Sequence, residues 1–573
     1  MGPRARRHPP RRPCRRRGDA AAHGVDARGR LARRGVRRVV LDAFADAHRR
    51  PPGTGLHLCD TFDGTPRFVD HREFPERIAG HADFFLDHGV RAGTRVLFPF
   101  ETTVDTILAF LALIEIGAVP LSVRPFALST PRKSYQDFLA RVAREFRAER
   151  VLRVPSLAPV DLPAPPLPLP PGDVRRPGAR LRHPHDQELA FVQFSSGSTA
   201  FPKGIPVRHG PLRANLAMIT RTDGRGRGDR VSSWLPLYHD MGLVGGMLSC
   251  FAVGCDLLLA DPATFLFDAR GWWEHMARER VMGTVIPNFA IDYSLRLMAS
   301  MTPQECAALD LSGIRAVYLG SEPVNLEHLR AFSALMAPAG LREDAFMPCY
   351  GMAEAVLLVS ARPPGAGIRT VASPAGVTAL SVGRPMPEFT VRIRDERGQV
   401  RGEGELGEIE IAGGSLAAGY FDREAPLAAP DGFYATGDIG FVDGGELFVT
   451  GRDSDRIKVN GQSLFAVDFE QTLERLPFVR SGRSVVAQRD GRVLVLLEAD
   501  RTARQDPDGT AERVVAQVVR TLGVAVAPED VHLLRAGQLP RTSSGKLRRR
   551  DAVQAHLRGE FTRPAAERRQ SPA

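Results

Sequence analysis

Residues 191–208 read FVQFSSGSTAFPKGIPVR, and this stretch tells more about the fold than any other in the chain. An apolar, β-like run enters a loop of small and hydroxyl residues, which Pro202, Lys203 and Gly204 close. Such a loop can offer several backbone N–H groups, hydroxyls and one ammonium group to phosphate oxygens. The stretch therefore predicts a strand that ends in a phosphate-binding loop.

The loop does not follow the Walker pattern G-x-x-x-x-G-K-S/T, and the pair Gly545-Lys546 is followed by Leu547. Both observations argue against a P-loop nucleotidase. Taken alone, a Ser/Gly-rich loop is equally compatible with a plain connection, so the rest of the chain has to decide.

Before this loop, short apolar runs alternate with stretches of helical periodicity. Residues 104–119, VDTILAFLALIEIGAV, show a helical pattern that leads into PLSV at 120–123. Such alternation predicts an α/β fold with a largely parallel sheet. Residues 155–171 are too rich in proline for a helix or a central strand, so we expect a surface loop there.

The sequence pattern of the chain changes near residues 451–455, after a stretch rich in Gly and Asp. Beyond it, residues 465–476 and 512–523 show helical patterns, and residues 484–500 read as a β-hairpin. We therefore expect a large domain over residues 39–451 and a small, mobile α+β domain over residues 452–573, joined by a short hinge.

Residues 1–38 hold fourteen Arg and two Asp and account for the net charge of +11, so the remaining chain is close to neutral. This segment has no apolar run, which predicts a disordered basic tail and argues against a secretory signal. Because the folded part carries no charge excess, we do not expect nucleic-acid binding.

The six cysteines are scattered, without a C-x-x-C pair or histidines at zinc spacing, so no disulfide framework or metal–thiolate site is expected. No uninterrupted apolar stretch reaches the roughly 18 residues of a membrane span. We therefore expect a cytoplasmic protein without a membrane span.

Seven segments together resemble, in the same order, the signatures of the adenylate-forming (AMP-binding) superfamily. That superfamily includes acyl-CoA synthetases, peptide-synthetase adenylation domains and luciferases. The segments are FVQFSSGSTAFPKGIPVR at 191–208, WLPLYHDMGL at 234–243, LGSEP at 319–323, YGMAEA at 350–355, YATGDIGFV at 434–442, TGRDSDRIKVNGQ at 450–462 and LPRTSSGKLRRR at 539–550. The resemblance implies an α/β large domain with mixed, mainly parallel sheets and a small mobile C-terminal domain.

Within the superfamily, the chain most resembles the fatty acyl-AMP ligases, through residues 234–246, 286–296, 319–325 and 446–457. These ligases use ATP and Mg²⁺ to convert a fatty acid to acyl-AMP with release of pyrophosphate. They then pass the acyl group to the phosphopantetheine thiol of a holo acyl carrier protein. They also carry an extra segment in the large domain, and residues 354–383 offer room only for a shortened version.

The resemblance implies that the loop and Lys203 hold the phosphates and that Glu354 and Thr199 hold Mg²⁺. Tyr350 would stack on adenine, and Asp438 with Arg452 would bind ribose. The nucleotide-binding residues implied in this way are Ser195, Ser196, Gly197, Ser198, Thr199, Lys203, Ser321, Glu322, Pro323, Tyr350, Gly351, Met352, Asp438 and Arg452.

Lys546, His239 and Glu354 are the implied catalytic residues. Lys546 resembles the mobile lysine of the small domain, which reaches the acyl carboxylate and the α-phosphate. His239 resembles the histidine beside that carboxylate, and Ser454 occupies the position about which the small domain turns. Candidates for the wall of the acyl channel are Asn288, Phe289, Ile291, Gly242 and Met247.

The nearest alternatives are an acyl-CoA or aryl-CoA ligase, which would use CoA as the acceptor, and a free-standing amino-acid adenylation domain. The fatty acyl-AMP ligases share the pair His239-Asp240, so Asp240 gives no support to an amino-acid substrate. An inactive adenylate-binding protein would lack Lys546, Glu354 or Asp438, and all three are present.

Overall fold

The computed structural model describes residues 44, 47, 50, 52–127, 130–157, 162–195, 201–374, 376–459, 462–489, 491–541 and 546–561. The expected tail at residues 1–38 lies outside this set. None of the described helices is long and apolar enough to cross a membrane.

The strand before the phosphate-loop segment belongs to a six-stranded sheet of order β6-β5-β3-β4-β7-β8. Its neighbouring pairs are parallel except β7 with β8. The helix expected at 104–119 is α3, which begins after the N-cap Thr103 and ends at Gly117, whose φ of 83° suits glycine. The bounds are β3 Arg95–Pro99, β4 Val119–Val123, β5 Arg150–Arg153, β6 Pro166–Pro168, β7 Leu189–Phe194, β8 Gly204–Arg208, α2 Phe74–Asp87, α3 Val104–Ile116 and α4 Arg132–Glu145.

Part of the proline-rich stretch is a strand, so the prediction of a loop over residues 155–171 is wrong at 166–168. β6 pairs in parallel with β5 at the edge of the sheet, where Val151 N donates to Pro165 O at 3.0 Å. An edge strand is bonded on one side only, so the missing N–H groups of its prolines cost few ladder hydrogen bonds.

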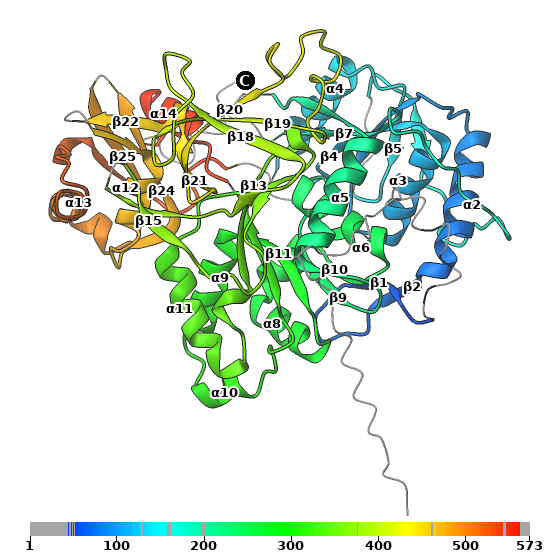
Figure 1. Cartoon of the computed structure of the whole chain (residues 1–573), viewed down its shortest axis with the longest axis horizontal. Helices are drawn as coiled ribbons and strands as arrows, with labels where there is room; N and C mark the ends of the chain where they lie inside the picture. The colour runs from blue at the N-terminus through cyan, green and yellow to red at the C-terminus, as the bar shows by residue number, and fades with distance from the viewer. Residues whose placement is uncertain are drawn as a thin grey trace, which may run out of the picture. The chain divides into compact units, whose positions relative to one another are not determined.

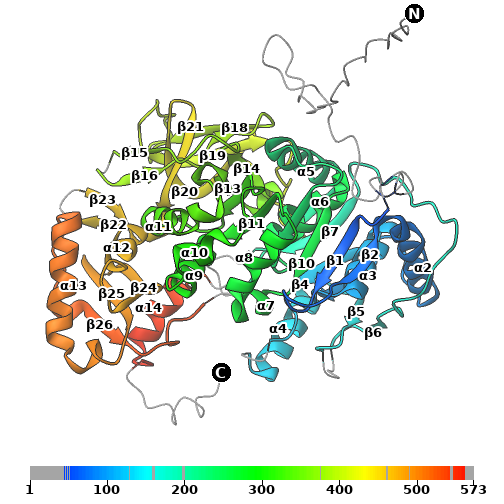
Figure 2. The same ribbon diagram turned by 90° about the horizontal axis from the view of Figure 1, so that it is seen from below.

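A nine-stranded sheet of order β17-β14-β13-β12-β11-β9-β10-β1-β2 contains a parallel core from β13 to β1. Figures 1 and 2 both show α9 and α11 beside one another, and the two helices are in contact. The bounds are β1 Gly55–Cys59, β2 Arg67–Asp70, β9 Arg230–Ser233, β10 Asp256–Ala260, β11 Gly283–Pro287, β12 Ala316–Gly320, β13 Phe346–Gly351, β14 Leu358–Ala361, β17 Arg384–Pro385, α5 His209–Asp223, the π-helix η3 Met241–Leu248, α6 Ser249–Val253, α7 Pro262–Phe267, α8 Ala269–Arg278, α9 Asn288–Met298, α10 Pro303–Ala307 and α11 Leu326–Met336.

Two smaller sheets follow along the chain. An antiparallel sheet of order β18-β19-β20-β21 carries the T-G-D and G-R-D segments, and β15 pairs with β16 in a separate hairpin. The bounds are β15 Thr370–Ala372, β16 Thr378–Leu380, β18 Phe389–Arg394, β19 Gly407–Gly413, β20 Tyr434–Asp443 and β21 Glu446–Arg452.

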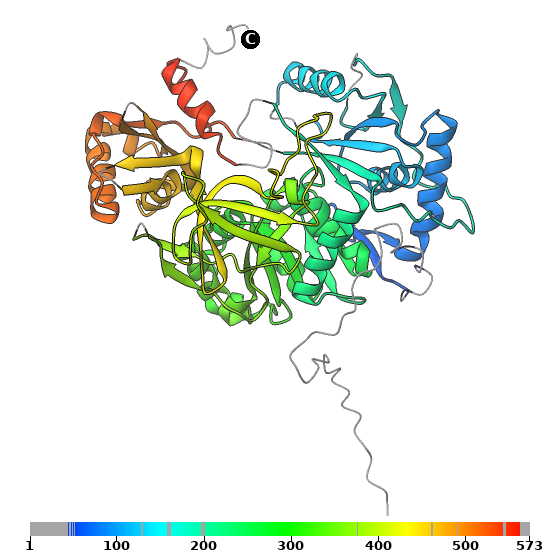
Figure 3. The same cartoon turned by 45° about the horizontal axis from the view of Figure 1, so that its top comes forward.

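The C-terminal region contains the expected helix, hairpin and second helix as α12, β24–β25 and α13. Figure 3 shows α14, the red helix near the end of the chain, close to these strands, and α14 contacts β24. The bounds are β22 Arg456–Val459, β23 Gln462–Phe465, α12 Ala466–Leu473, β24 Val479–Arg489, β25 Arg492–Ala499, α13 Pro507–Leu522, β26 Val531–Leu534 and α14 Arg549–Leu557.

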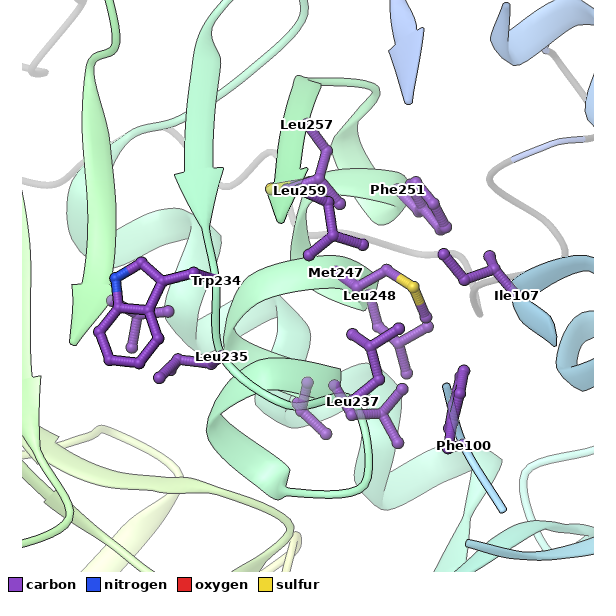
Figure 4. Packing of buried hydrophobic residues seen from close by; sticks show 14 of the residues in the cluster. Phe100, Ile107, Trp234, Leu235, Leu237, Met247, Leu248, Phe251, Leu257 and Leu259 are labelled. Atoms are coloured by element: carbon purple, nitrogen blue, oxygen red, sulfur yellow. The ribbon is translucent and has the colours of Figure 1, made fainter. Parts of the chain in front are cut away.

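Separate hydrophobic cores accompany this organisation. One cluster runs from Phe44 to Leu447, and another runs from Ile457 to Val531. Figure 4 shows part of the first, where Met247 and Leu248 lie near Leu259 of β10 and Ile107 of α3. The mainly parallel sheets with their helices and the smaller C-terminal part confirm the predicted fold class, while the domain limits at 38 and 451 stay predictions.

One buried amide fixes the turn that follows β13. Asn215 on α5 donates to Ala355 O and Leu358 O and accepts from Leu358 N, each at 3.0 Å. Between these groups lies Val356, whose φ of 70° is strained for a β-branched residue. Asn215 therefore holds a strained turn next to Glu354.

Replacing Asn215 by Ala should lower the free energy of unfolding by about 3 kcal/mol, because it leaves buried backbone groups without partners. Chemical denaturation measures the loss. Thr220→Val is the matched control: it lies on the same helix, and among the described residues its hydroxyl bonds to Leu216 O and Ala217 O of that helix. Equal effects of the two changes would contradict the role of Asn215.

Candidate active site

A cavity of about 1580 Å³ opens at the carboxyl ends of strands from both large sheets. Ser195 follows β7, Trp234 follows β9, and Ser321 follows β12. Ligands in open α/β folds bind at this end of the strands. The C-terminal region also contributes to the wall, through Lys546 among others.

The cavity wall brings together the described residues that the sequence analysis assigned to the site. These are Ser195, Lys203, His239, Ser321, Glu322, Pro323, Tyr350, Gly351, Met352, Glu354, Asp438, Arg452 and Lys546. Ser196, Gly197, Ser198 and Thr199 lie outside the described residues. The roles of all these residues stay predictions.

The candidates for the acyl channel divide into two groups. Asn288, Phe289 and Gly242 line the cavity. Ile291 and Met247 do not: both are fully buried in the hydrophobic core, and Figure 4 shows Met247 packed there. The prediction is therefore wrong for these two, because apolar character does not tell a channel wall from a core position.

Asp438 lies at the centre of a hydrogen-bonded cluster. Tyr350 Oη donates to Asp438 Oδ2 at 2.7 Å, and Arg452 Nε donates to Oδ1 at 3.1 Å. Asp438 and Arg452 are opposite each other in the β20–β21 ladder. Burial and then the Asp438 charge raise the pKa of Tyr350, so its hydroxyl stays a donor. The cluster presents a fixed carboxylate to the cavity.

Tyr420 joins two predicted site residues and was missed in the sequence analysis. Lys203 Nζ donates to Tyr420 Oη at 3.2 Å, and Tyr420 Oη donates to Glu354 Oε1 at 3.1 Å. Its neighbour Phe421 N donates to Gly204 O at 2.8 Å, which fixes the loop beside β8. The only sequence signal at this position is the Gly-Tyr pair at 419–420, which is common in loops and does not indicate a functional residue.

His239 lies in the cavity wall with Nε2 shielded from solvent and without a hydrogen-bond partner among the described residues. Burial, and after it the charge of Lys546, lower the pKa of His239 to about 3. The imidazole is therefore neutral near pH 7. A neutral ring with a shielded Nε2 is able to accept or donate one further hydrogen bond.

Two carboxylates face Lys546. Asp240 Oδ1 accepts from Met241 N at 2.8 Å, and Glu322 accepts from Phe289 N at 2.7 Å. Burial raises the pKa of both acids, and the Lys546 charge opposes that rise. Burial lowers the pKa of Lys546, and Asp240 and Glu322 oppose this change. The three groups thus stabilise one another's charges.

Polar contacts hold the C-terminal region against the large one. Asn325 Nδ2 donates to Glu474 Oε2 at 2.8 Å, and Arg475 pairs with Glu327 at 2.5 Å. Asn325 also caps α11, because its side chain accepts from Glu327 N at 3.1 Å. These contacts define the orientation in which Lys546 reaches the cavity.

Arg549 ties together three elements of the C-terminal region. It donates from Nε to Glu470 Oε1 of α12 at 2.8 Å and from Nη1 to Asp455 Oδ2 at 3.0 Å. Asp455 is one residue from Ser454, the expected hinge position. The side chain of Arg549 therefore binds two carboxylates within the protein and stabilises the fold of this region.

Among the described residues, no three or more His, Cys, Asp and Glu side chains are grouped so that they could hold a metal ion by themselves. Glu354 can still contribute one oxygen ligand, which is the usual share of a protein when Mg²⁺ binds together with substrate phosphates. Such a site fits the residues present.

The family model described as AMP-binding enzyme matches residues 46–421, and the model for the AMP domain of Disco-interacting protein 2-like proteins matches residues 454–565. A Caulobacter vibrioides protein named "Putative acyl-CoA synthetase" is 32% identical over 89% of this chain and 94% of its own. The medium-chain-fatty-acid–acyl-carrier-protein ligase JamA of Moorena producens is 33% identical over 63% of this chain and 66% of its own.

Among solved structures, one from a study of fatty acyl-adenylate ligases of E. coli and L. pneumophila is similar to this chain with a TM-score of 0.82. Its sequence is 27% identical, and the match covers 92% of this chain and 99% of that one. The similarity thus extends over both the large and the C-terminal regions.

Replacing Lys546 by Ala should raise the pKa of His239 from about 3 toward its ordinary value, because one of its two causes is removed. NMR titration of ring-labelled histidine measures the shift, and His239→Gln assigns the signal. Lys458→Ala, which changes an exposed lysine of the same region, should leave the pKa unchanged. If the pKa of His239 is the same in wild type and in Lys546→Ala, the two side chains lie apart in solution.

Proposed function

The chain belongs to the AMP-binding enzyme family, and we propose that it activates a fatty acid with ATP and transfers the acyl group to an acyl carrier protein. It is an acid-activating ligase that resembles the fatty acyl-AMP ligases. In the first step, a carboxylate oxygen attacks the α-phosphorus, the α–β phosphoanhydride bond breaks, and pyrophosphate leaves. In the second step, a thiolate displaces AMP from the acyl carbon.

The observation that carries this proposal is the meeting of three kinds of group in one cavity: a fixed carboxylate, a lysine–glutamate pair and a lysine from the C-terminal region. Asp438 has four lone-pair positions and uses two of them for Tyr350 and Arg452. The other two suit the vicinal hydroxyls of a ribose. The ring of Tyr350 in the same wall offers a face for adenine.

Lys203 and Glu354 suit the other end of the nucleotide. Through Tyr420 they are held close together before any ligand binds. The ammonium of Lys203 would bind phosphate oxygens, and Glu354 would hold Mg²⁺, with Thr199 as a further proposed ligand. When bound, Mg²⁺ neutralises charge on the phosphates.

His239 and Lys546 would act on the acid. A neutral His239 can hydrogen-bond to the carboxylate through its free Nε2 without protonating it. Lys546 would stabilise the charge that develops at the α-phosphate, and positioned charges of this type give the largest single effect in many active sites. No covalent bond to the enzyme is required.

Lys546→Ala should slow acyl-AMP formation about 100- to 1,000-fold, the effect of removing one well-placed donor. Transfer from supplied acyl-AMP to the carrier should change little, since the lysine acts on the carboxylate and the α-phosphate during the first step. Pyrophosphate exchange measures the first step, and carrier acylation measures the second. Equal losses in both steps would indicate a folding defect or a different role, and Lys458→Ala controls for loss of a lysine in this region.

Likeness to other ligases and one segment of the fold both bear on which acceptor thiol the enzyme uses. JamA is named as a ligase that uses acyl carrier protein, whereas the Caulobacter relative is named as an acyl-CoA synthetase. Between Glu354 and Gly383, where a shortened extra segment was expected, lies the β15–β16 hairpin. Val377 of this hairpin packs against the core of the C-terminal region. A short segment at this place speaks for CoA, so the preference for the carrier rests on the likeness to JamA and to the fatty acyl-adenylate ligases.

With a fatty acid, ATP and Mg²⁺, the enzyme should acylate a holo carrier protein far faster than free CoA. Carrier proteins are generally acidic, so Arg550→Glu, a change at an exposed basic residue of α14, should slow carrier acylation but not pyrophosphate exchange. Arg501→Glu, at an exposed arginine beyond β25, is the control for charge reversal in the same region. Arg549 is unsuitable for this test because it bonds to Glu470 and Asp455.

The assay compares both thiols at equal concentration over several carriers and acids. If acyl-CoA forms as readily as acyl-carrier, the enzyme is a CoA ligase and the carrier assignment is wrong. If Arg550→Glu slows both steps equally, the basic helix does not serve the carrier.

A further inference from the structure

An apolar arm of the cavity enters the large region between the nine-stranded sheet and the helices beside it. Its wall consists of Ile219 of α5, Gly245 of η3, Val285 of β11, Tyr318 of β12, Cys349 of β13 and Leu357. His239 comes just before η3 and lines the same cavity as Gly245, which lies within that helix. The helix therefore connects the place proposed for the substrate carboxylate with this apolar part of the wall.

Tyr318 is at the deep end of this arm. β12 runs toward the cavity and ends at Gly320, so Tyr318 lies two residues below the strand end. Among the described residues of β11, β12 and β13, none nearer the amino end than Val285, Tyr318 or Cys349 lines the cavity. The Tyr318 ring thus faces the end of the space available to a substrate.

The Tyr318 ring is held from two sides. Its hydroxyl donates to Ile219 O at 3.1 Å, which fixes the far end of the side chain. Behind it, the guanidinium carbon of Arg225 lies 5.8 Å from the ring centroid. Only 4% of Tyr318 is exposed, so neighbouring atoms leave it little freedom to move aside.

The support behind the ring is a buried ion pair. Arg225 and Asp223 side chains are 1% and 0% exposed and pair at 2.5 Å, and Arg225 Nη1 donates to Ser249 Oγ at 2.9 Å. Removing such charges from water is costly, and the cost is offset only while the hydrogen bonds stay intact. An alkyl chain that pushed into this space would break them. The pair therefore forms a boundary that an apolar tail cannot displace.

We propose that Tyr318, supported by the Asp223–Arg225 pair, is the residue that ends the acyl channel and limits the length of the straight-chain acid that the enzyme accepts. The proposal rests on the proposed function, because it assumes that the acid binds with its carboxylate beside His239. It goes beyond that function by assigning chain-length selection to one residue.

A substitution at Gly245 should shorten the space for the acyl chain, the opposite of the effect expected from a smaller residue at position 318. A Cβ at this position would lie 3.0 Å from Leu357 Cδ2, the end of a flexible side chain, and 3.9 Å from Val285 Cγ2. The fold can absorb this contact by a small movement of Leu357. Gly245→Ala should therefore narrow the arm, whereas a smaller residue at 318 should lengthen it.

The experiment measures kcat/KM of the full chain by pyrophosphate exchange over a series of saturated straight-chain fatty acids of increasing length. For wild type, each methylene within the arm should raise kcat/KM by about fourfold, until a limit beyond which it falls. Tyr318→Val, which retains a β-branched residue suited to the strand, should move the limit to longer acids. An acid two methylenes beyond the wild-type limit should then gain about 16-fold.

Tyr318→Phe retains the ring and should keep the wild-type limit, while Gly245→Ala should move the limit to shorter acids. The shortest accepted acid reports on folding and should react at the wild-type rate in the Tyr318 variants. An unchanged limit in Tyr318→Val, or the same shift in Tyr318→Phe, would overturn the proposal. If Tyr318→Val does not fold, an unchanged limit in Gly245→Ala overturns it instead.

The two levels of the proposal fail differently. If wild type exchanges pyrophosphate with none of the acids, the proposed function itself is wrong. If exchange occurs and the limit does not respond to residues 318 and 245, the function stands and the assignment of the channel end is wrong.

Discussion

The site depends on one charge, the Lys546 ammonium, which the C-terminal region brings to the half-buried carboxylates of Asp240 and Glu322. Burial disfavours the charged form of all three groups, and their mutual attraction opposes that effect. When Lys546 is absent, both acids lose the cation that lowers their pKa values. The ionisation of Asp240 and Glu322 is therefore linked to the orientation of the C-terminal region. A change in either one shifts the other.

The sequence predicts those parts of the fold that local pattern specifies. Residues 104–116 form α3 because an apolar helical run lies between a capping threonine and a glycine with positive φ. β6 could not be predicted in this way, since a proline-rich strand depends on its partner β5 at a sheet edge. The same limit applies to Asn215, whose three bonds join residues about 140 positions apart. Pairings of this kind follow from the tertiary fold and leave no local pattern.

For the candidate site, contiguous motifs predicted which residues line the cavity, and single residues outside the motifs were missed. Tyr420 bonds to Lys203 and Glu354, which are 217 and 66 positions away in the chain. Ile291 and Met247 are apolar and follow site motifs, yet both face the core. A helix adjacent to a cavity has one face toward it and another toward the core, and the side of each residue is decided by packing. Tyr318 could not be assigned for the same reason, since its position at the channel end depends on Arg225 behind it.

The edge strand β6 has a consequence for the protein outside its active site. An open sheet edge with free N–H groups can pair with an edge of another molecule and start aggregation. β6 has the sequence Pro166-Leu167-Pro168, so two of its three residues have no N–H to donate. A second chain that approached this edge would find too few donors to extend the sheet. The prolines therefore make this edge of the sheet a poor site for the addition of a strand from another molecule.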